Sequence, residues 1–331
     1  MATLRLFARL KEIAGSARVE IDGSTISEVL DEANRRFGSE FALAAKTARV
    51  WRNGDEAELG DSVEPGDEVA LLPPVSGGSA TITATPQLTA AVPVVVTAVL
   101  VFANLRGDEA WWAAALVAAA GLWVIDVADQ MHARGRPFPA IAVALGAVAG
   151  AVISQALGPV GLAVALALAV AIVLSWGVGV AGYRSVDTMA PAVMVGMLAA
   201  GAVGSLVLTR LEGTPDPQAI DVFLFSVIVA TLLGIVVDHL ADLPYLDPYT
   251  VTALAAILTT VIVAVVQDLD VAGYMLVGLG LAVTLVAGRG LGALLRTGSP
   301  ALAERAPGFL RAFDGAVLAA LLYFPLIRLV L

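Results

Sequence analysis

The sequence predicts two fold classes in one chain: a small α+β head, followed by an all-α polytopic membrane bundle of about nine transmembrane helices. The whole chain is 59% apolar and 15% charged, whereas an average soluble domain carries about 25% charged residues. Residues 1–78 hold 9 Lys+Arg and 14 Asp+Glu, but residues 79–331 hold only 10 Arg, no Lys and 15 Asp+Glu. The first part is therefore expected to fold in water and the second in a lipid bilayer, with the boundary at the Pro- and Gly-rich segment 73–78.

The first 78 residues show the patterns of a small mixed domain. Alternating apolar and polar residues predict strands at 3–8, 17–21, 48–52 and 68–72. The turn residues 14–16 favour a hairpin between the first two strands, and Asn53-Gly54 turns the third. A helix is expected after Ser24 or Thr25, either of which can cap it, and Gly38 ends it. This ββαββ order is typical of a β-grasp domain.

Four stretches of the head also carry a resemblance to a known family. They are Leu6-Phe7-Ala8-Arg9-Leu10, Asn53-Gly54, Gly66-Asp67-Glu68-Val69 and Pro73-Pro74-Val75-Ser76-Gly77-Gly78. Together they resemble the MoaD/ThiS family of ubiquitin-like sulfur carriers, which includes the small subunit of molybdopterin synthase. The resemblance implies that Gly77 and Gly78 form a reactive tail whose terminal carboxylate is adenylated and becomes a thiocarboxylate. It implies an adenylating enzyme or a molybdopterin-synthase-like large subunit as partner.

The sequence departs from that family at the reacting atom. Gly78 is followed by Ser79, so its carbonyl belongs to an amide and cannot be adenylated as it stands. Two interpretations remain open: the glycines are a flexible tether to the membrane, or a protease first cuts the Gly78–Ser79 bond. The expected organisation is a head at 1–78, a linker at 79–87 and a transmembrane domain at 88–331.

Nine apolar runs follow the linker, and each approaches the length that crosses a bilayer. They lie near 88–105, 110–128, 140–157, 160–181, 189–209, 220–237, 250–266, 271–288 and 313–331. Membrane lipids are therefore expected partners. Neither half is basic enough to predict nucleic-acid binding, and the absence of cysteine excludes disulfides and thiolate metal sites.

The arginines predict the orientation. With the head in the cytoplasm, seven arginines fall in inner loops and three in outer segments, as the positive-inside rule requires. The expectation is a multi-pass protein of the inner (plasma) membrane, with a cytoplasmic head and the C-terminus outside.

Two inner loops contain the candidate site residues of the membrane half. Asp238 and Asp242 lie in the first, and the second, 289–314, is rich in arginine. Carboxylates beside arginines are suited to a divalent cation and a phosphate. The candidate phosphate-binding residues are Arg296, Arg305 and Arg311. Alternatively, the carboxylates cap helices and the arginines only set topology.

Residues 204–213 and 307–315 carry a second resemblance. Through them the membrane half resembles the phosphatidate cytidylyltransferases, which make CDP-diacylglycerol from CTP and phosphatidic acid. The family's closing signature is degenerate, because Ala306, Arg311, Ala312 and Gly315 replace its His, Asp, Arg and Ser. Asp314 is the one matched metal ligand, and it joins Asp238 and Asp242 as a candidate for Mg²⁺ if the domain is active.

These observations leave three hypotheses of function. The first is a membrane-anchored, sulfur-carrier-like fusion protein whose membrane half is an inactive enzyme-like bundle (a pseudoenzyme) that serves as scaffold or lipid-binding module. The second is an active, diverged CTP-dependent lipid head-group transferase, since phosphoryl-type transfer depends on placed charge. The third is a precursor, cut after Gly78 to release a sulfur carrier or protein modifier. Whether the chain is an enzyme stays open.

Overall fold

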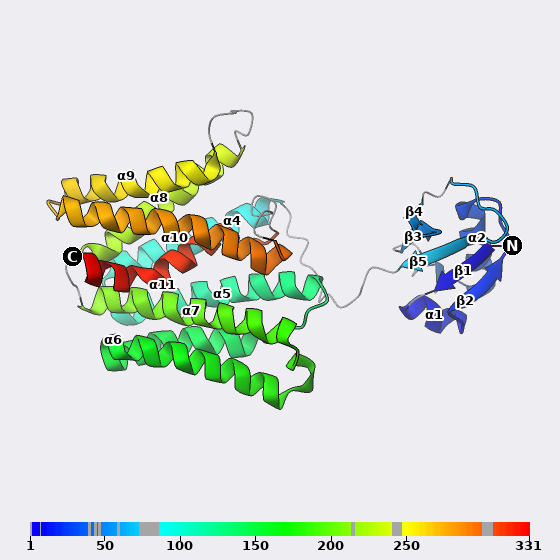
Figure 1. Cartoon of the computed structure of the whole chain (residues 1–331), viewed down its shortest axis with the longest axis horizontal. Helices are drawn as coiled ribbons and strands as arrows, with labels where there is room; N and C mark the ends of the chain where they lie inside the picture. The colour runs from blue at the N-terminus through cyan, green and yellow to red at the C-terminus, as the bar shows by residue number, and fades with distance from the viewer. Residues whose placement is uncertain are drawn as a thin grey trace. The chain divides into compact units, whose positions relative to one another are not determined.

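A computed structural model describes residues 2–6, 8–38, 41–42, 45, 48–57, 60–72, 86–212, 216–239, 247–299 and 307–331. The chain forms two compact units, Met1–Ser79 and Ala80–Leu331 (Figure 1). The first unit, the head, contains a sheet and short helices. The second, the helical unit, consists of long apolar helices.

The head is built on a five-stranded mixed sheet with strand order β2-β1-β5-β3-β4. The strands are β1 Ala2–Leu6, β2 Arg18–Ile21, β3 Arg49–Arg52, β4 Asp55–Glu56 and β5 Glu68–Leu72. β1 and β5 are parallel neighbours at the centre, and the other pairs are antiparallel. Leu4 and Leu71 of these central strands are fully buried, and they share a core with Val29 of helix α2, Ile26–Phe37. The predicted β-grasp head is confirmed.

The connection between the first two strands differs from the prediction. The strands pair as expected, with Ala2 opposite Ile21, but helix α1, Ala8–Ala14, connects them in place of a tight hairpin. Its residues Ala, Arg, Leu, Lys and Glu are strong helix formers. Leu10 is fully buried in the head core, so packing on the sheet stabilises this short helix.

The ends of α2 and the turn after β3 follow the sequence. Of the two predicted caps, Thr25 is the one used: its hydroxyl accepts a hydrogen bond from the Glu28 amide. Gly38 ends the helix at φ 86°. Asn53 and Gly54 both have positive φ, the conformation that a tight β3–β4 turn requires.

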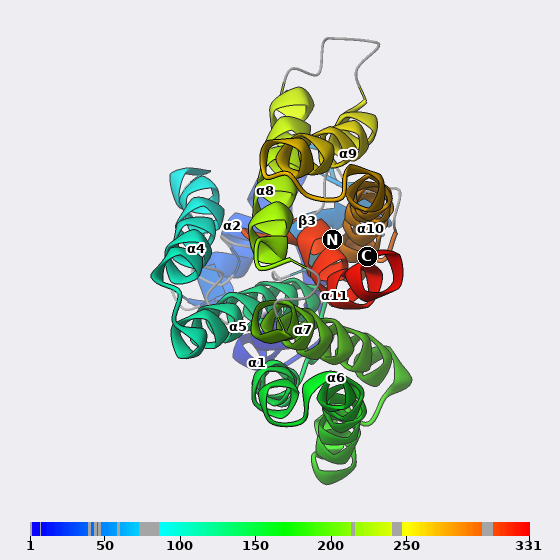
Figure 2. The ribbon, with the colours of Figure 1, turned by 90° about the vertical axis from the view of Figure 1, so that its left-hand side faces the viewer.

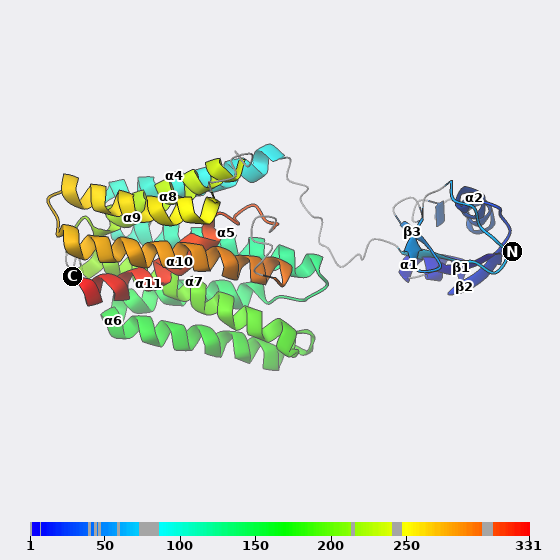
Figure 3. The ribbon, with the colours of Figure 1, turned by 45° about the horizontal axis from the view of Figure 1, so that its top comes forward.

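The helical unit comprises eight long helices and one short 3₁₀ turn, η1, among the described residues. They are α4 Pro86–Arg106, α5 Glu109–Ala133, α6 Ala140–Gly179, η1 Ala181–Tyr183, α7 Val186–Glu212, α8 Ala219–His239, α9 Pro248–Val266, α10 Val271–Thr297 and α11 Phe313–Val330. Helices α5 to α11 are each long and apolar enough to cross a membrane, and Ala91–Arg106 of α4 is a shorter apolar helix. Seven such helices indicate a membrane-spanning protein. Figures 2 and 3 show the helices side by side.

Helix α6 accounts for two of the nine predicted spans. Gly158 leaves the helical conformation at φ 59° and is followed by Pro159, which lacks the amide hydrogen needed to continue the ladder. The two arms fold back on one another, because a Cβ placed on Gly146 would lie 3.2 Å from the Cβ of Ala169. With α6 counted as a helical hairpin, the prediction of about nine helices is confirmed.

Helix α7 is the most buried of the seven apolar helices: 83% of its most apolar 18-residue stretch is buried inside the protein. Small residues permit this close packing, as they commonly do in lipid. A Cβ on Gly150 of α6 would lie only 2.2 Å from the Ala200 carbonyl oxygen of α7. The α6–α7 contact therefore requires glycine at that position.

Candidate functional sites

The glycine tail follows β5, a central strand of the head sheet. β5 pairs with β1 on one side and with β3 on the other, and Val69 and Leu71 are fully buried. Gly77 and Gly78 follow shortly after the end of β5, but they lie outside the described residues. The sheet therefore fixes where the tail begins.

A hydrogen-bonded turn fixes the entry to β5. The Asn53 side chain donates to Asp67 Oδ1 at 2.7 Å, and its oxygen accepts from the Glu68 amide at 2.9 Å. Asp67 Oδ2 accepts from the Glu64 amide at 2.9 Å. Hydrogen-bond donors stabilise the ionised carboxylate and so lower the pKa of Asp67. The Glu64 amide makes the larger contribution and the Asn53 side chain the next.

The helical unit contains a large amphipathic cavity, which we call the α4–α8 cavity. Its volume is about 1020 Å³. The apolar wall comes from α4, α5, α7, α8 and α11 and includes Leu100, Ala119 and Val227. The polar side chains Asp238, Thr252, Arg289, Arg311 and Asp314 also line it. The cavity thus combines a long apolar surface with charged groups contributed by α8, α10, α11 and the segment before α11.

Arg289 is held toward this cavity by two neighbours at the start of α9. Its guanidinium carbon lies 4.7 Å from the centre of the Tyr249 ring, a cation–π distance. Its Nη1 lies at the long hydrogen-bond distance of 3.4 Å from Thr252 Oγ1. Arg289 is half-buried, so its charge remains available to a ligand in the cavity.

Arg296, two turns further along α10, is enclosed instead. Its side chain is fully buried and forms ion pairs with Asp126 of α5 and Asp314 of α11. Nε and Nη2 donate to the two oxygens of Asp314, each at 2.9 Å, and Nη1 donates to Asp126 at 2.6 Å. Trp123 Nε1 also donates to Asp314 at 2.8 Å.

Asp126 fixes the segment that leads into α11. Its oxygens accept hydrogen bonds from the amides of Phe309 and Leu310, at 2.9 and 3.0 Å. A carboxylate that receives two backbone amides and a guanidinium has satisfied acceptors. The Asp126–Arg296–Asp314 group, which we call the buried triad, therefore joins α5, α10 and the start of α11.

The structure brings some of the predicted residues together. Arg296 and Asp314 are paired directly, while Asp238, Arg311 and Asp314 line the same cavity. Asp242 and Arg305 lie outside the described residues. Among the residues described, no cluster of three or more His, Asp or Glu side chains is placed to hold a metal ion. The metal and phosphate roles remain predictions.

Sequence reasoning missed Asp126, Trp123 and Arg289. Asp126 was detectable, since it is a carboxylate inside an apolar run and such residues mark an internal partner. Trp123 lies in the same apolar run, and no pattern in the sequence indicates that its ring is buried or that its indole nitrogen donates to Asp314. Arg289 was counted only as a loop charge, although it belongs to α10.

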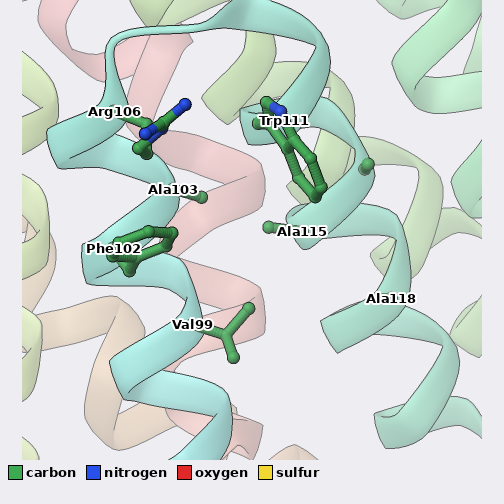
Figure 4. A pocket seen from close by; sticks show the side chains of 8 residues that line it. Val99, Phe102, Ala103, Arg106, Trp111, Ala115 and Ala118 are labelled. Carbon is green, nitrogen blue, oxygen red and sulfur yellow. The ribbon is translucent and has the colours of Figure 1, made fainter.

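A second, smaller groove of about 380 Å³ lies between α4 and α5 (Figure 4). Val99 and Phe102 line it from α4, and Ala115 and Ala118 from α5. Arg106 and Trp111 lie at one end of it, near the α4–α5 turn. Its walls are otherwise apolar.

The comparisons with known proteins concern the head. Residues 4–78 match the ThiS family. Small archaeal modifier protein 1 of Haloferax volcanii is 44% identical over 85 residues, which cover 22% of this chain and 97% of that protein. Two crystal structures of that modifier from H. volcanii are 39% and 37% identical. They cover 23% and 22% of this chain and 98% and 97% of theirs, each with a TM-score of 0.20.

Proposed function

Through residues 4–78 this chain belongs to the ThiS family, and we propose that it holds a ubiquitin-like, sulfur-carrier-like head at a membrane. One observation carries the proposal: the family's head continues, in the same chain, into seven long apolar helices. The glycine pair that ends the family match is followed by Ser79 and then by α4. The 79–87 segment acts as linker, and the helical unit acts as anchor.

The expected location is the inner (plasma) membrane, with the head in the cytoplasm. The excess of arginine in the loops on the head side supports this orientation. A cytoplasmic head would be accessible to an adenylating enzyme or to a large subunit of the molybdopterin-synthase type.

The test is fractionation of host cells that express the chain with an epitope tag near the N-terminus. We expect the tag in the membrane fraction, resistant to salt and alkaline extraction. Recovery of the tag in the soluble fraction would contradict the tether. A chain truncated after Gly78 is the matched control, and it should be soluble.

Release of the head is the second candidate function. It is favoured by the length of the matched modifier, because the head alone corresponds to 97% of that protein. Hydrolysis of the Gly78–Ser79 amide would add water and leave a free Gly78 carboxylate, the group that adenylation requires. Deleting Gly77 and Gly78 should abolish any soluble fragment if this route operates.

For the helical unit we propose a scaffold role that keeps only the fold of the cytidylyltransferases. The engagement of Asp314 supports this, since both of its oxygens accept from Arg296 and one also accepts from Trp123. Arg296 is likewise committed to carboxylates and is not offered to a phosphate. A Mg²⁺-dependent transfer from CTP to lipid that Asp314→Asn abolishes would overturn the scaffold proposal.

A further inference from the structure

We propose that α4 is a lateral gate of the α4–α8 cavity. The helix swings about Asn104, near its C-terminal end, and its N-terminal half moves away from α8 to open the cavity sideways to the bilayer. This gate goes beyond the proposed anchor role, and it rests on the helical unit lying in a membrane.

One side chain ties the C-terminal end of α4 to its neighbours. The Asn104 amide nitrogen donates to Asp221 Oδ1 of α8 at 2.6 Å. Arg210 of α7 donates to the Asn104 side-chain oxygen at 2.6 Å and to its carbonyl oxygen at 3.2 Å. The Arg210 guanidinium carbon also lies 5.6 Å from the centre of the Trp112 ring of α5, a cation–π distance. Asn104 therefore connects α4 to α7 and α8 directly, and to α5 through Arg210.

The N-terminal half of α4, at the edge of the helical unit (Figure 2), is held much less firmly. Of the described side chains from Ala91 to Arg106, Asn104 alone forms a hydrogen bond to another helix. Only Val96 and Ala103 among them are buried, whereas α5 buries eleven side chains. Lipid supplies no hydrophobic force between helices, so close packing and interhelical hydrogen bonds hold them together. The N-terminal half has little of either.

The cavity is lined by this weakly held part of α4. The lining residues of α4 all lie between Pro93 and Val101, on the N-terminal side of Asn104. Val94 of α4 and Leu232 of α8 both line the cavity, and they are 64% and 53% exposed. The cavity therefore reaches the lipid-facing surface between these two helices. Movement of α4 away from α8 would widen this opening without breaking the contacts of Asn104.

The chain itself permits this movement at one end of α4 and restricts it at the other. Residues 79–85, predicted as linker, precede α4, so no neighbouring span has to move with its N-terminal end. Pro93 lies inside the helix, and it lacks the amide hydrogen of a regular helical turn, so the helix can bend there. At the other end, only Gly107 and Asp108 separate α4 from α5.

A pivot at Asn104 predicts movement that increases along the helix. At a rise of about 1.5 Å per residue, Val94 lies about 15 Å from Asn104 along the axis and Phe102 about 3 Å. A given rotation of α4 should therefore move Val94 about five times as far as Phe102.

The test is the distance distribution between two spin labels, measured by double electron–electron resonance on the full chain in dioleoyl phosphatidylcholine nanodiscs. The chain has no cysteine, so labels attach only to introduced ones. Val94→Cys with Leu232→Cys forms the opening pair, and Phe102→Cys with Phe225→Cys forms the pivot pair. All four side chains are half or more exposed.

We expect the distribution of the opening pair to be at least about twofold broader than that of the pivot pair, because label motion dilutes the fivefold difference in movement. Narrow distributions for both pairs would show a fixed wall and overturn the gate. Equally broad distributions would show a helix without a pivot, and would overturn it as well.

Substitutions test the pivot itself. Asn104→Leu removes the hydrogen bonds at similar side-chain volume, and it should broaden the pivot distribution to the width of the opening pair. Arg106→Gln is the matched control on the same turn, and it should change neither distribution. An unchanged pivot distribution in Asn104→Leu, or equal broadening in Arg106→Gln, would contradict the role of Asn104. The labelled chains without these substitutions test the gate even if Asn104→Leu does not fold.

The gate and the tether can fail separately. Both labelled pairs lie in the helical unit, so cleavage after Gly78 in the host would overturn the tether and leave the two distributions unchanged. Equal distributions in a chain that stays whole would overturn the gate and leave the tether intact.

Discussion

Carboxylates receive backbone amides in both units, but in different surroundings. In the head, Asp67 accepts from the Glu64 amide and from Asn53, and its side chain is partly exposed to solvent. In the helical unit, Asp126 accepts from the Phe309 and Leu310 amides with its side chain fully buried. Water can replace a lost partner at the first site and not at the second. Hydrogen bonds of the same geometry should therefore contribute little to the stability of the head and much more to the stability of the helical unit.

The largest effect is expected from Arg296→Met. It leaves Asp126 and Asp314 buried without their cation, and breaking a buried ion pair in this way costs about 3–5 kcal/mol. Thermal unfolding of the purified chain in detergent would measure it. The Arg296→Met, Asp126→Asn, Asp314→Asn triple variant removes the charges together and should recover much of the loss. An Arg296→Met variant that unfolds at the wild-type temperature would contradict the structural role of the buried triad.

Asp126→Asn should have an intermediate effect. The amide keeps one oxygen acceptor but loses the charge that Arg296 faces, and an unsatisfied buried group costs about 1–3 kcal/mol. Because Asp126 holds the Phe309 and Leu310 amides, hydrogen exchange should rise at those two residues. Exchange that is unchanged there would show that the segment before α11 is held by something else.

Arg289→Gln should scarcely alter stability, although the residue lies only two turns from Arg296. It contacts the face of the Tyr249 ring and makes one long hydrogen bond to Thr252, and isolated contacts of this kind are worth about 0.5–1 kcal/mol. The unfolding temperature in detergent should therefore fall far less than for Arg296→Met. A comparable fall would mean that Arg289 is structural too.

The smallest effect is expected from Asp67→Asn, and it should depend on pH. The pKa of Asp67 is lowered in the folded head, chiefly by the Glu64 amide. Its contribution is therefore present above the unfolded pKa, about 3.9, and is lost as the pH falls through the lower folded value. Hydrogen exchange of β3 and β5 in the full chain should show acid loosening that is smaller in Asp67→Asn than in wild type. Equal acid sensitivity in the two proteins would assign the effect to other carboxylates.

What the sequence predicted well was local. The Thr25 cap, the Asn53-Gly54 turn and the nine apolar runs each depend on neighbouring residues and on the length of a span. The missed helix α1 shows the limit of such patterns. The predicted turn at 14–16 is present, but it connects α1 to β2 instead of connecting two strands, and the burial of Leu10 on the sheet stabilises the helix before it.

The candidate site of the helical unit was less predictable, because its contacts are distant in sequence. Arg296 and Asp126 are 170 residues apart, and no periodic pattern in the sequence predicts that α5 and α10 are in contact at these residues. The prediction of Arg296 as a phosphate ligand followed from the basic segment 289–314, and it did not anticipate that the residue lies in α10 and pairs with Asp126. Asp126 could have signalled an internal cation, whereas the orientation of Arg289 toward Tyr249 needed the fold.

We propose that the ThiS-family head stays joined to its membrane anchor. The most direct measurement is the intact mass of the protein purified from its native host through a tag near the N-terminus. We expect one membrane-bound species that carries both the head and the helical unit, with a mass of at least 33.8 kDa before the tag. A soluble tagged fragment that ends at Gly78 would contradict it, and would identify the chain as a membrane-held precursor of a free ubiquitin-like protein.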